Sequence, residues 1–404
     1  MLIFLFVAST LAQKRIQCNQ KTTLLFHKSS IYNFSVKVLY RVAHGRDGHF
    51  VYSPLSTWLQ LVDLAEGAQG TTAEEIRKVT GYHKRLCYRR KLRQILITMY
   101  NRLKETSKRN RIMIFDELLD VKHSYRHKVL VDNNVKILLL QFNRENNSLD
   151  GADISLPDDT KRAIEEALRE LMYPLEYNEM LMIDNASYDI KWKYPFNPAQ
   201  TKLAAFYYNG MVGEVNMMTQ IGKFNVTEIP LIKAKILELP CLNDDRVTML
   251  FFLPTEGYVD EVFYNLRRTR LRSIFHKFET QGLRTVNVSI PRFHIDTDID
   301  NLPELLDDMG LKSMFNLGAA NFTGITDYKM HASIMSQKIS IDPKYLTSIF
   351  VNFKIFQIKY VFHITSEVME CLQMTEVFDI DLRQFIDAEV QRFVHENVFP
   401  YFFT

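Results

Sequence analysis

The sequence predicts a protein of the α+β class with largely antiparallel sheets. Its first part carries helical patterns, whereas short apolar or alternating runs typical of strands dominate its second part. The two kinds of segment do not alternate as they do in proteins built around a parallel sheet. No repeat, low-complexity tract or Pro/Gly-rich linker divides the 404 residues, which favours one large domain.

Three segments predict helices. In STWLQLVDLAEGA, residues 56–68, apolar residues recur near helical spacing. In TTAEEIRKV, residues 71–79, Thr71 or Thr72 is the expected N-cap, because glutamates follow in the first turn. Further along, NLPELLDDMGL, residues 301–311, predicts a short amphipathic helix that ends at its glycine.

Five segments predict strands, because each is a short run rich in apolar or alternating residues that ends at Pro, Asp or Asn. They are VKILLLQF (135–142), EMLMIDNASYDI (179–190), KAKILELP (233–240), VTMLFFLP (247–254) and LRTVNVSIPRFHI (283–295). Since these strands are not separated by regular crossover helices, their sheets should be mainly antiparallel.

Composition sets limits on partners. With 47% apolar and 24% charged residues, the chain is an ordinary globular protein that can bury a large core. A formal net charge of +3 is too close to balance for nucleic acid to be the main partner, because phosphate binding needs a concentrated basic face. Any site for a polyanion must therefore be local.

The N-terminus reads MLIFLFVASTLAQKR, an apolar run followed by small residues. This pattern predicts a signal peptide over residues 1–12 and an extracellular protein, while a buried first strand is the alternative. Four cysteines are too few and too scattered for a disulfide framework, and none has the spacing of a zinc or redox site. The candidate glycosylation sites are Asn33, Asn146, Asn225, Asn287 and Asn321. A further sequon at Asn185 falls within a predicted buried strand.

No pattern for catalysis, metal binding or cofactor binding stands out. The segment EGAQGTTAEE, residues 66–75, resembles a phosphate-binding loop but lacks the lysine that would reach the phosphates, so we interpret it as a turn that starts a helix. Nucleophile-elbow and HExxH motifs are absent from the sequence, and single histidines such as His294 have no catalytic partner nearby. The sequence therefore predicts no enzyme, no metal and no cofactor.

One local concentration of charge occurs in HKRLCYRRKLRQ. Several of its cations are spaced three or four residues apart and would share a helix face: Lys84, Arg85, Arg89, Arg90, Lys91 and Arg93. One interpretation is an ordinary solvated face. The other is a binding site for a polyanion, such as a sulfated glycosaminoglycan.

Several motifs follow the order of one known family. The segments are FVYSPLSTWLQLVDLAEGAQGTTAEEI, DNASYDIKWKYPFNPAQTK, VNMMTQIGKF, LFFLPTEG, IPRFHID and LDDMGLKSMFNLGAANFTGIT. Together they resemble the serpins, a family of serine protease inhibitors, over roughly Phe34 to Ile341. The first carries the family's Ser-Pro-Leu-Ser before a helix, and the second its Asn-Ala-x-Tyr strand with Trp192.

The resemblance implies one serpin-like domain over residues 30–404, with three mostly antiparallel β-sheets and eight or nine helices. It also implies an exposed reactive loop that serves as bait for a serine protease. After cleavage, the loop inserts into the main sheet as an extra strand and carries the acylated protease with it, which releases stored strain. The family activity is thus inhibition by a suicide-substrate mechanism.

The sequence departs from the family where the loop should begin. The strand ASIMSQKISID carries Gln337 where the family has a histidine, and Pro343 and an apolar run then replace the family's hinge of small residues. Glu-Val-x-Glu at 367–370 resembles the family's entry into that hinge. We therefore interpret residues 343–366 as an insertion.

Three interpretations compete for the apolar run at 342–364. A transmembrane helix needs about 20 mostly apolar residues, and polar residues interrupt this run too often. A strand suits its Phe, Ile, Val and Tyr content better. Its richness in Ile, Phe, Lys, Asn and Tyr, which AT-rich codons encode, is typical of unspliced noncoding sequence.

The last segment, FVHENVFPYFF, resembles the family's strand near the C-terminus, although the chain ends at Thr404, before the family's final Gly-Arg-containing strand. Counting back from Phe393 makes Arg383, followed by Gln384, the expected bait, which implies a trypsin-like target.

Two functions are therefore expected for a secreted serpin-like chain. The first is inhibition of a serine protease, and the second is a non-inhibitory role as a binding, carrier or storage protein, which the missing hinge favours. A glycosaminoglycan is the further partner considered, nucleic acid and membranes are not expected partners, and the chain is expected to be a monomer.

Overall fold

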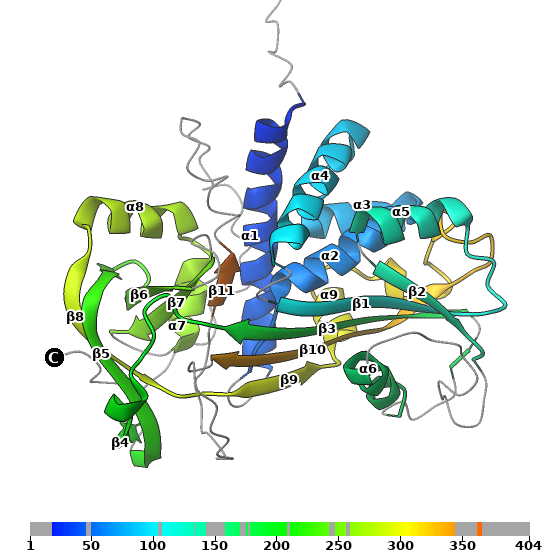
Figure 1. Ribbon diagram of the computed structural model, residues 1–404. Coiled ribbons are helices and arrows are strands. Elements are labelled where there is room, and N and C mark those ends of the chain that lie inside the picture. Colours follow the sequence, from blue (N-terminus) through cyan, green and yellow to red (C-terminus); the bar gives the residue numbers. More distant parts are fainter. Residues whose placement is uncertain are drawn as a thin grey trace, which may run out of the picture.

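The computed structural model describes residues 18–45, 50–103, 107–133, 135–142, 158–169, 175–176, 178–207, 211–241, 247–255, 259–343 and 362–365 (Figure 1). The predicted signal peptide, Asn146, Arg383, Gln384 and most of the 343–366 insertion lie outside these residues.

The described residues form nine α-helices. They are α1 (Gln20–His44), α2 (Pro54–Ala65), α3 (Gly70–Thr80), α4 (Leu86–Leu103), α5 (His123–Asn133), α6 (Asp158–Arg169), α7 (Val259–Leu266), α8 (Leu271–Gln281) and α9 (Leu302–Asp307). Two short 3₁₀ turns, η1 (Pro198–Gln200) and η2 (Ser313–Phe315), complete the helical elements in this part of the chain. None of these helices is both long enough and apolar enough to cross a membrane.

The main sheet has five strands in the order β2-β1-β3-β10-β9. Their bounds are β1 (Ser107–Asp116), β2 (Val135–Leu140), β3 (Glu179–Ile190), β9 (Ile295–Ile299) and β10 (His331–Pro343). The pairs β1/β2 and β3/β10 are parallel, and the other two are antiparallel. The two central strands of this sheet, β3 and β10, are thus far apart in sequence.

The long strand β5 (Met211–Ile229) belongs to two further sheets. Its first part pairs with β4 (Lys202–Tyr207) and β8 (Arg284–Pro291), and its last part pairs with β6 (Ala234–Pro240). From β6 the sheet continues to β7 (Val247–Pro254) and β11 (Phe362–Thr365). All these pairs are antiparallel, so the expected α+β architecture of three mostly antiparallel sheets is confirmed.

The main sheet separates two layers of helices (Figure 1). Because side chains alternate along a strand, Met180 and Met182 of β3 join the large core beneath α2, whereas Leu181 and Ile183 face α6 on the opposite side. Ten of the twelve residues of α2 are buried. This helix therefore occupies the centre of the molecule, directly against the sheet.

Four of the predicted strands are found where the sequence placed them, and 179–190 and 247–254 match β3 and β7 end to end. The prediction of one strand over 283–295 is wrong, because β8 ends at Pro291 and β9 begins at Ile295 in another sheet. The predicted N-cap of α3 is wrong: Gln69 is the N-cap, and Thr71 and Thr72 lie inside the helix. The buried Thr72 hydroxyl instead accepts a hydrogen bond of 3.0 Å from the backbone N–H of Asn321. The Thr72 side chain therefore makes a tertiary hydrogen bond and does not cap the helix.

The turn before α3 is structural, as its missing lysine indicated. The Gly324 backbone N–H donates to the Gly67 carbonyl at 3.0 Å. A Cβ at Gly67 would come within 2.2 Å of the Ile325 side chain, so only glycine fits this close approach.

Candidate functional site

The boundary between β3 and β10 is the first candidate site. The two parallel strands pair from Glu179↔His331 to Ile190↔Pro343, with one irregularity between Ala332 and Ile334. The side-chain bond described between these strands is a long one of 3.4 Å, from the Ser333 hydroxyl to the Met180 carbonyl. Main-chain hydrogen bonds and the packing of buried apolar side chains from both strands hold β3 to β10.

The N-terminus of α2 is fastened to β10 by Gln337. The Ser53 N–H donates to Gln337 Oε1 at 2.7 Å, and Gln337 Nε2 donates to the Ser53 carbonyl at 3.1 Å. Gln337 is fully buried, so both halves of its amide are satisfied by one residue of the helix cap. Ser53 is itself the N-cap, since its side chain accepts from the Ser56 N–H.

Three buried charged residues, Asp63, Arg111 and Asp184, and the partly buried Arg109 fasten α2 to the other side of the boundary. Arg109 of β1 donates from Nε and Nη2 to the two carboxylate oxygens of Asp184 of β3, at 3.1 and 2.5 Å. Arg109 also donates to the Ser56 hydroxyl of α2, and Arg111 of β1 pairs with Asp63 of α2. The two positive and two negative charges balance, as buried charges must.

The register of the sheet brings these groups into one row. Arg111 on β1, Asp184 on β3 and Gln337 on β10 are paired at the Cα level across three adjacent strands. Asp184 and Gln337 are fully buried, and Arg111 is 4% exposed. The sequence analysis missed the two arginines and both aspartates. A signal was present, because an aspartate stands inside the apolar run EMLMID.

This arrangement has a mechanical consequence for opening the sheet. A strand that entered between β3 and β10 would move them apart by about 4.8 Å, the width of one strand. The helix α2 contacts β10 through Gln337, and it contacts β1 through Arg109 and Arg111. Since hydrogen bonds break over such a distance, entry of a strand must release one of these two sets of contacts.

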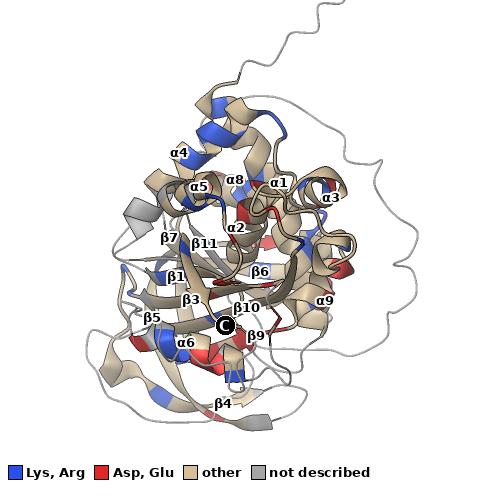
Figure 2. Cartoon of the chain, turned by 90° about the vertical axis from the view of Figure 1, so that its right-hand side faces the viewer, with Lys and Arg blue, Asp and Glu red and all other residues tan. Residues whose placement is uncertain are grey.

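The predicted basic segment forms the start of α4 and the turn before it (Figure 2). Lys84, Arg85 and Arg90 are exposed, and Lys91 and Arg93 are half-buried. Arg89 forms an internal ion pair, because its Nη1 lies 3.1 Å from the carboxylate of Glu66, whose side chain is 1% exposed. Tyr82 and Lys128 also donate to Glu66.

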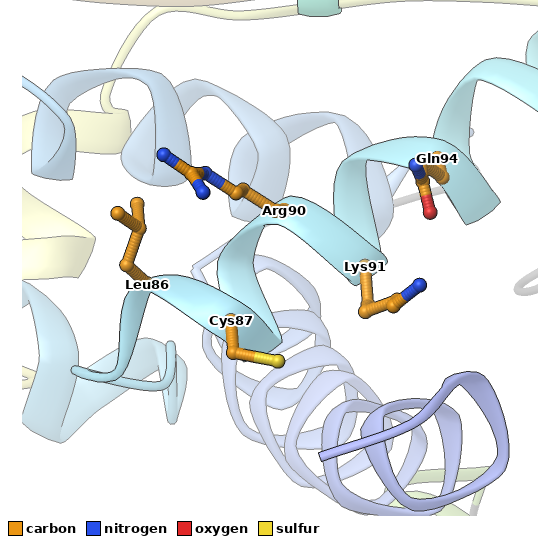
Figure 3. Close-up of a pocket in the computed structure, with 5 residues that line it drawn as sticks. All are labelled: Leu86, Cys87, Arg90, Lys91 and Gln94. Carbon is orange, nitrogen blue, oxygen red and sulfur yellow. The ribbon is translucent and has the colours of Figure 1, made fainter.

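A shallow depression on α4 contains two of the predicted cations, Arg90 and Lys91. It is lined by Leu86, Cys87, Arg90, Lys91 and Gln94 (Figure 3). Cys87 forms a disulfide with Cys18, which fixes the segment before α1 to the first turn of α4. The sequence analysis did not foresee this pairing, because cysteines 69 positions apart carry no local signal.

Comparison with protein-family models matches residues 29–344 to the family described as serpin (serine protease inhibitor). The chain belongs to the serpin family. An uncharacterised serpin-like protein of Methanosarcina acetivorans is 27% identical over 300 residues, which cover 73% of this serpin and 69% of that protein.

Solved serpins share the fold. The structure of a tumour-suppressing serpin superimposes with a TM-score of 0.66 at 19% identity, covering 79% of this chain and 90% of that one. Native protease nexin-1, solved with heparin, has a TM-score of 0.64 at 19% identity and covers 82% of this chain and 90% of that one.

Other chemistry is not evident in the described part of this serpin. No group of three or more His, Cys, Asp or Glu residues there could hold a metal ion. His294 is exposed and lies 2.8 Å from Asp296 on the surface. The expected bait residues lie outside the described residues, and β11 is the one described strand beyond Pro343.

The sequons differ in their surroundings. Asn33 on α1 and Asn287 on β8 are exposed, whereas Asn225 donates to Glu238 at 2.7 Å. Asn321 accepts from the Thr323 hydroxyl at 2.9 Å. Asn185 lies in β3, between β1 and β10, as predicted for that sequon.

Proposed function

We propose that this chain is a secreted inhibitor of a trypsin-like serine protease that acts by inserting its cleaved loop between β3 and β10. The main observation in support is the parallel pairing of these strands across the centre of a five-stranded sheet. An antiparallel strand entering there would replace one ladder of main-chain hydrogen bonds with two. Insertion is therefore favourable once the contacts of α2 have yielded.

The test is incubation with trypsin followed by denaturing electrophoresis. An SDS-stable adduct of chain and protease is the expected result, and Arg383→Ser should abolish the adduct while leaving thermal unfolding unchanged. Cleavage of the chain without an adduct would contradict inhibition.

A second candidate function is that of a non-inhibitory binding, carrier or storage protein. Two observations favour it: the sequence lacks small residues where the hinge is expected, and α2 fastens both sides of the β3/β10 boundary. Trypsin discriminates the two functions. A non-inhibitory chain is cut within the loop, leaves the protease active, and melts at the same temperature before and after the cut.

We further propose that the outer face of α4 binds a sulfated glycosaminoglycan. Support comes from the exposed cations Lys84, Arg85 and Arg90 beside Lys91, and from the fold shared with protease nexin-1, which was solved with heparin. Arg90→Ser with Lys91→Ser should lower the salt concentration at which the chain leaves a heparin column. Because Arg89 is bound to Glu66, Arg89→Ser should mainly lower stability. Equal elution of the double variant and the unaltered chain would refute this site.

Secretion is part of the proposal, and the Cys18–Cys87 disulfide supports it, because such bonds persist in oxidising compartments. Expressed with its first residues in a secreting eukaryotic cell, the chain should reach the medium with glycans at Asn33 and Asn287. Peptide mass spectrometry after deglycosylation checks this. Unmodified asparagine at both positions would count against it.

A further inference from the structure

The helix α1 packs against α7 (Figure 1). Four cations lie on the second half of α1 and in the turn that follows α7. Lys37 and Arg41 are one helical turn apart on α1, and Arg267 and Arg268 lie in the turn. None of them belongs to the basic face of α4.

The turn is fixed to α1 before any ligand arrives. The Tyr32 hydroxyl lies 2.9 Å from the Leu266 carbonyl and 2.8 Å from the Thr269 carbonyl, the two residues that flank the arginine pair. The Thr269 hydroxyl donates to the Asn265 carbonyl at 3.0 Å. The backbone that carries Arg267 and Arg268 is thus held in place.

Two tyrosine rings orient the guanidinium groups. The Arg267 guanidinium lies 5.8 Å from the ring centroids of both Tyr40 and Tyr264. Arg268 lies 4.8 Å from the Tyr264 ring, and its Nη2 donates to the Tyr264 hydroxyl at 2.8 Å. A guanidinium held by its face keeps N–H groups at its edge for an anion.

Lys37, Arg41 and Arg267 repel one another. Burial lowers the pKa of Lys37 and of Arg41, and the charge of Arg267 lowers both further. Asp308 and, more weakly, Tyr40 act in the opposite sense on the pKa of Arg41. Among the ion pairs of the described residues, none includes any of the four cations.

Like charges held close together disfavour the fold, and proteins tolerate such unfavourable arrangements mainly at functional sites. Lys37 and Arg41 are like charges four residues apart on one helix, a spacing that destabilises the helix unless an anion lies between them. A tetrahedral dianion would relieve the repulsion from both elements at once.

We propose that Lys37, Arg41, Arg267 and Arg268 form a binding site for a tetrahedral sulfate or phosphate group. Forked arginine donors match the oxygen spacing of such a group, and charge-assisted hydrogen bonds to it are the strong ones. The group can belong to a sulfated sugar chain or be free phosphate. The site is independent of protease inhibition, since it shares no residue with the β3/β10 boundary.

Thermal unfolding of the full chain, at constant ionic strength set with KCl, tests this site. Inorganic phosphate and a heparin tetrasaccharide are added separately. The probe that raises the melting temperature at the lower concentration shows whether the bound group is free phosphate or part of a sulfated sugar chain. In a chain that also carries Arg90→Ser and Lys91→Ser, which remove the proposed heparin site on α4, Arg267→Ser with Arg268→Ser should weaken the response to the probes at least tenfold. Arg272→Ser, an equal loss of charge at an exposed position on α8, should leave it unchanged.

Lys37→Ser provides a second variant that keeps all three arginine–ring contacts, and it should weaken the response severalfold. The proposal is overturned if neither probe stabilises the unaltered chain, or if the double variant responds as strongly as Arg272→Ser. Binding to phosphatidylserine vesicles that the double variant loses, without any response to the two probes, would overturn it in favour of a lipid surface.

Discussion

Replacing Asp184 by asparagine removes one negative charge from the cluster of Arg109, Arg111, Asp63 and Asp184 between the main sheet and α2. Its carboxylate accepts two hydrogen bonds from Arg109, and Arg111 Nε lies 4.0 Å away. Removing one partner of a buried ion pair costs about 3 to 5 kcal/mol, because the remaining charge stays buried. Since Arg109 keeps Ser56 and Arg111 keeps Asp63, we expect the lower end, about 3 kcal/mol.

Urea unfolding at pH 7, followed by tryptophan fluorescence, measures this loss. The matched control is Asp296→Asn on β9 of the same sheet. The Asp296 side chain is 62% exposed and pairs with His294, so this substitution should change the free energy of unfolding by less than about 1 kcal/mol. Adding Arg109→Gln to the Asp184 variant removes the opposite charge and should recover part of the loss. Equal stability of the Asp184 and Asp296 variants would refute the reasoning, because it would mean that the buried charges do not depend on one another.

Three further predictions concern stability. Burial lowers the pKa of His27 from 6.5 to about 4, so the unfolded chain takes up this proton first and stability falls as the pH drops below 6.5. Between pH 8 and pH 5 the free energy of unfolding should fall by about 2 kcal/mol because of His27. A His27→Gln variant unfolded in urea at both pH values should not show this fall. If its stability falls as much as that of the unaltered chain, His27 is not the group responsible. Gln337→Ala leaves the Ser53 N–H and carbonyl without their partner and should cost about 2 kcal/mol, with faster hydrogen exchange at the Ser53 amide; unchanged exchange would show that Gln337 does not hold α2. Replacing Cys18 and Cys87 by serine removes the disulfide and should lower the free energy of unfolding by about 2 to 4 kcal/mol, measured in thermal or urea unfolding. The control is Cys241→Ser, which changes a buried free cysteine and tests whether any cysteine change has the same effect.

Four strand segments and three helices could be predicted from local patterns, because the strand segments are short, apolar and sharply bounded. The segment EMLMIDNASYDI ends where β3 ends, and VTMLFFLP ends where β7 ends. The spacing of apolar residues also located α2. These features depend on local patterns, which one sequence contains.

The parts that escaped prediction depend on contacts between distant residues. Thr72 is drawn into a hydrogen bond with Asn321, which no local rule for N-caps can anticipate. Cys18 finds Cys87 through the packing of α1 against α4. The charged row of Arg111, Asp184 and Gln337 exists only once the strand register is known.

The candidate sites were predicted only in part. The basic segment of α4 was recognised, but the sequence could not show that Arg89 belongs to Glu66 and is therefore unavailable to a polyanion. The cations of the α1–α7 junction were missed entirely. Arg267 begins the basic run RRTRLR, but Lys37 lies 230 positions away, and only the fold brings the two together. The assignment of Arg383 as bait stays a prediction.

If this serpin inhibits by insertion, β3 and β10 must part to admit the cleaved loop. The decisive measurement is a structure of the chain after a single tryptic cut at Arg383. We expect a sixth strand between β3 and β10 and the loss of either the Gln337–Ser53 contacts or the Arg109–Ser56 contact. A cut chain in which Asp184 still pairs with Gln337 across adjacent strands would contradict it.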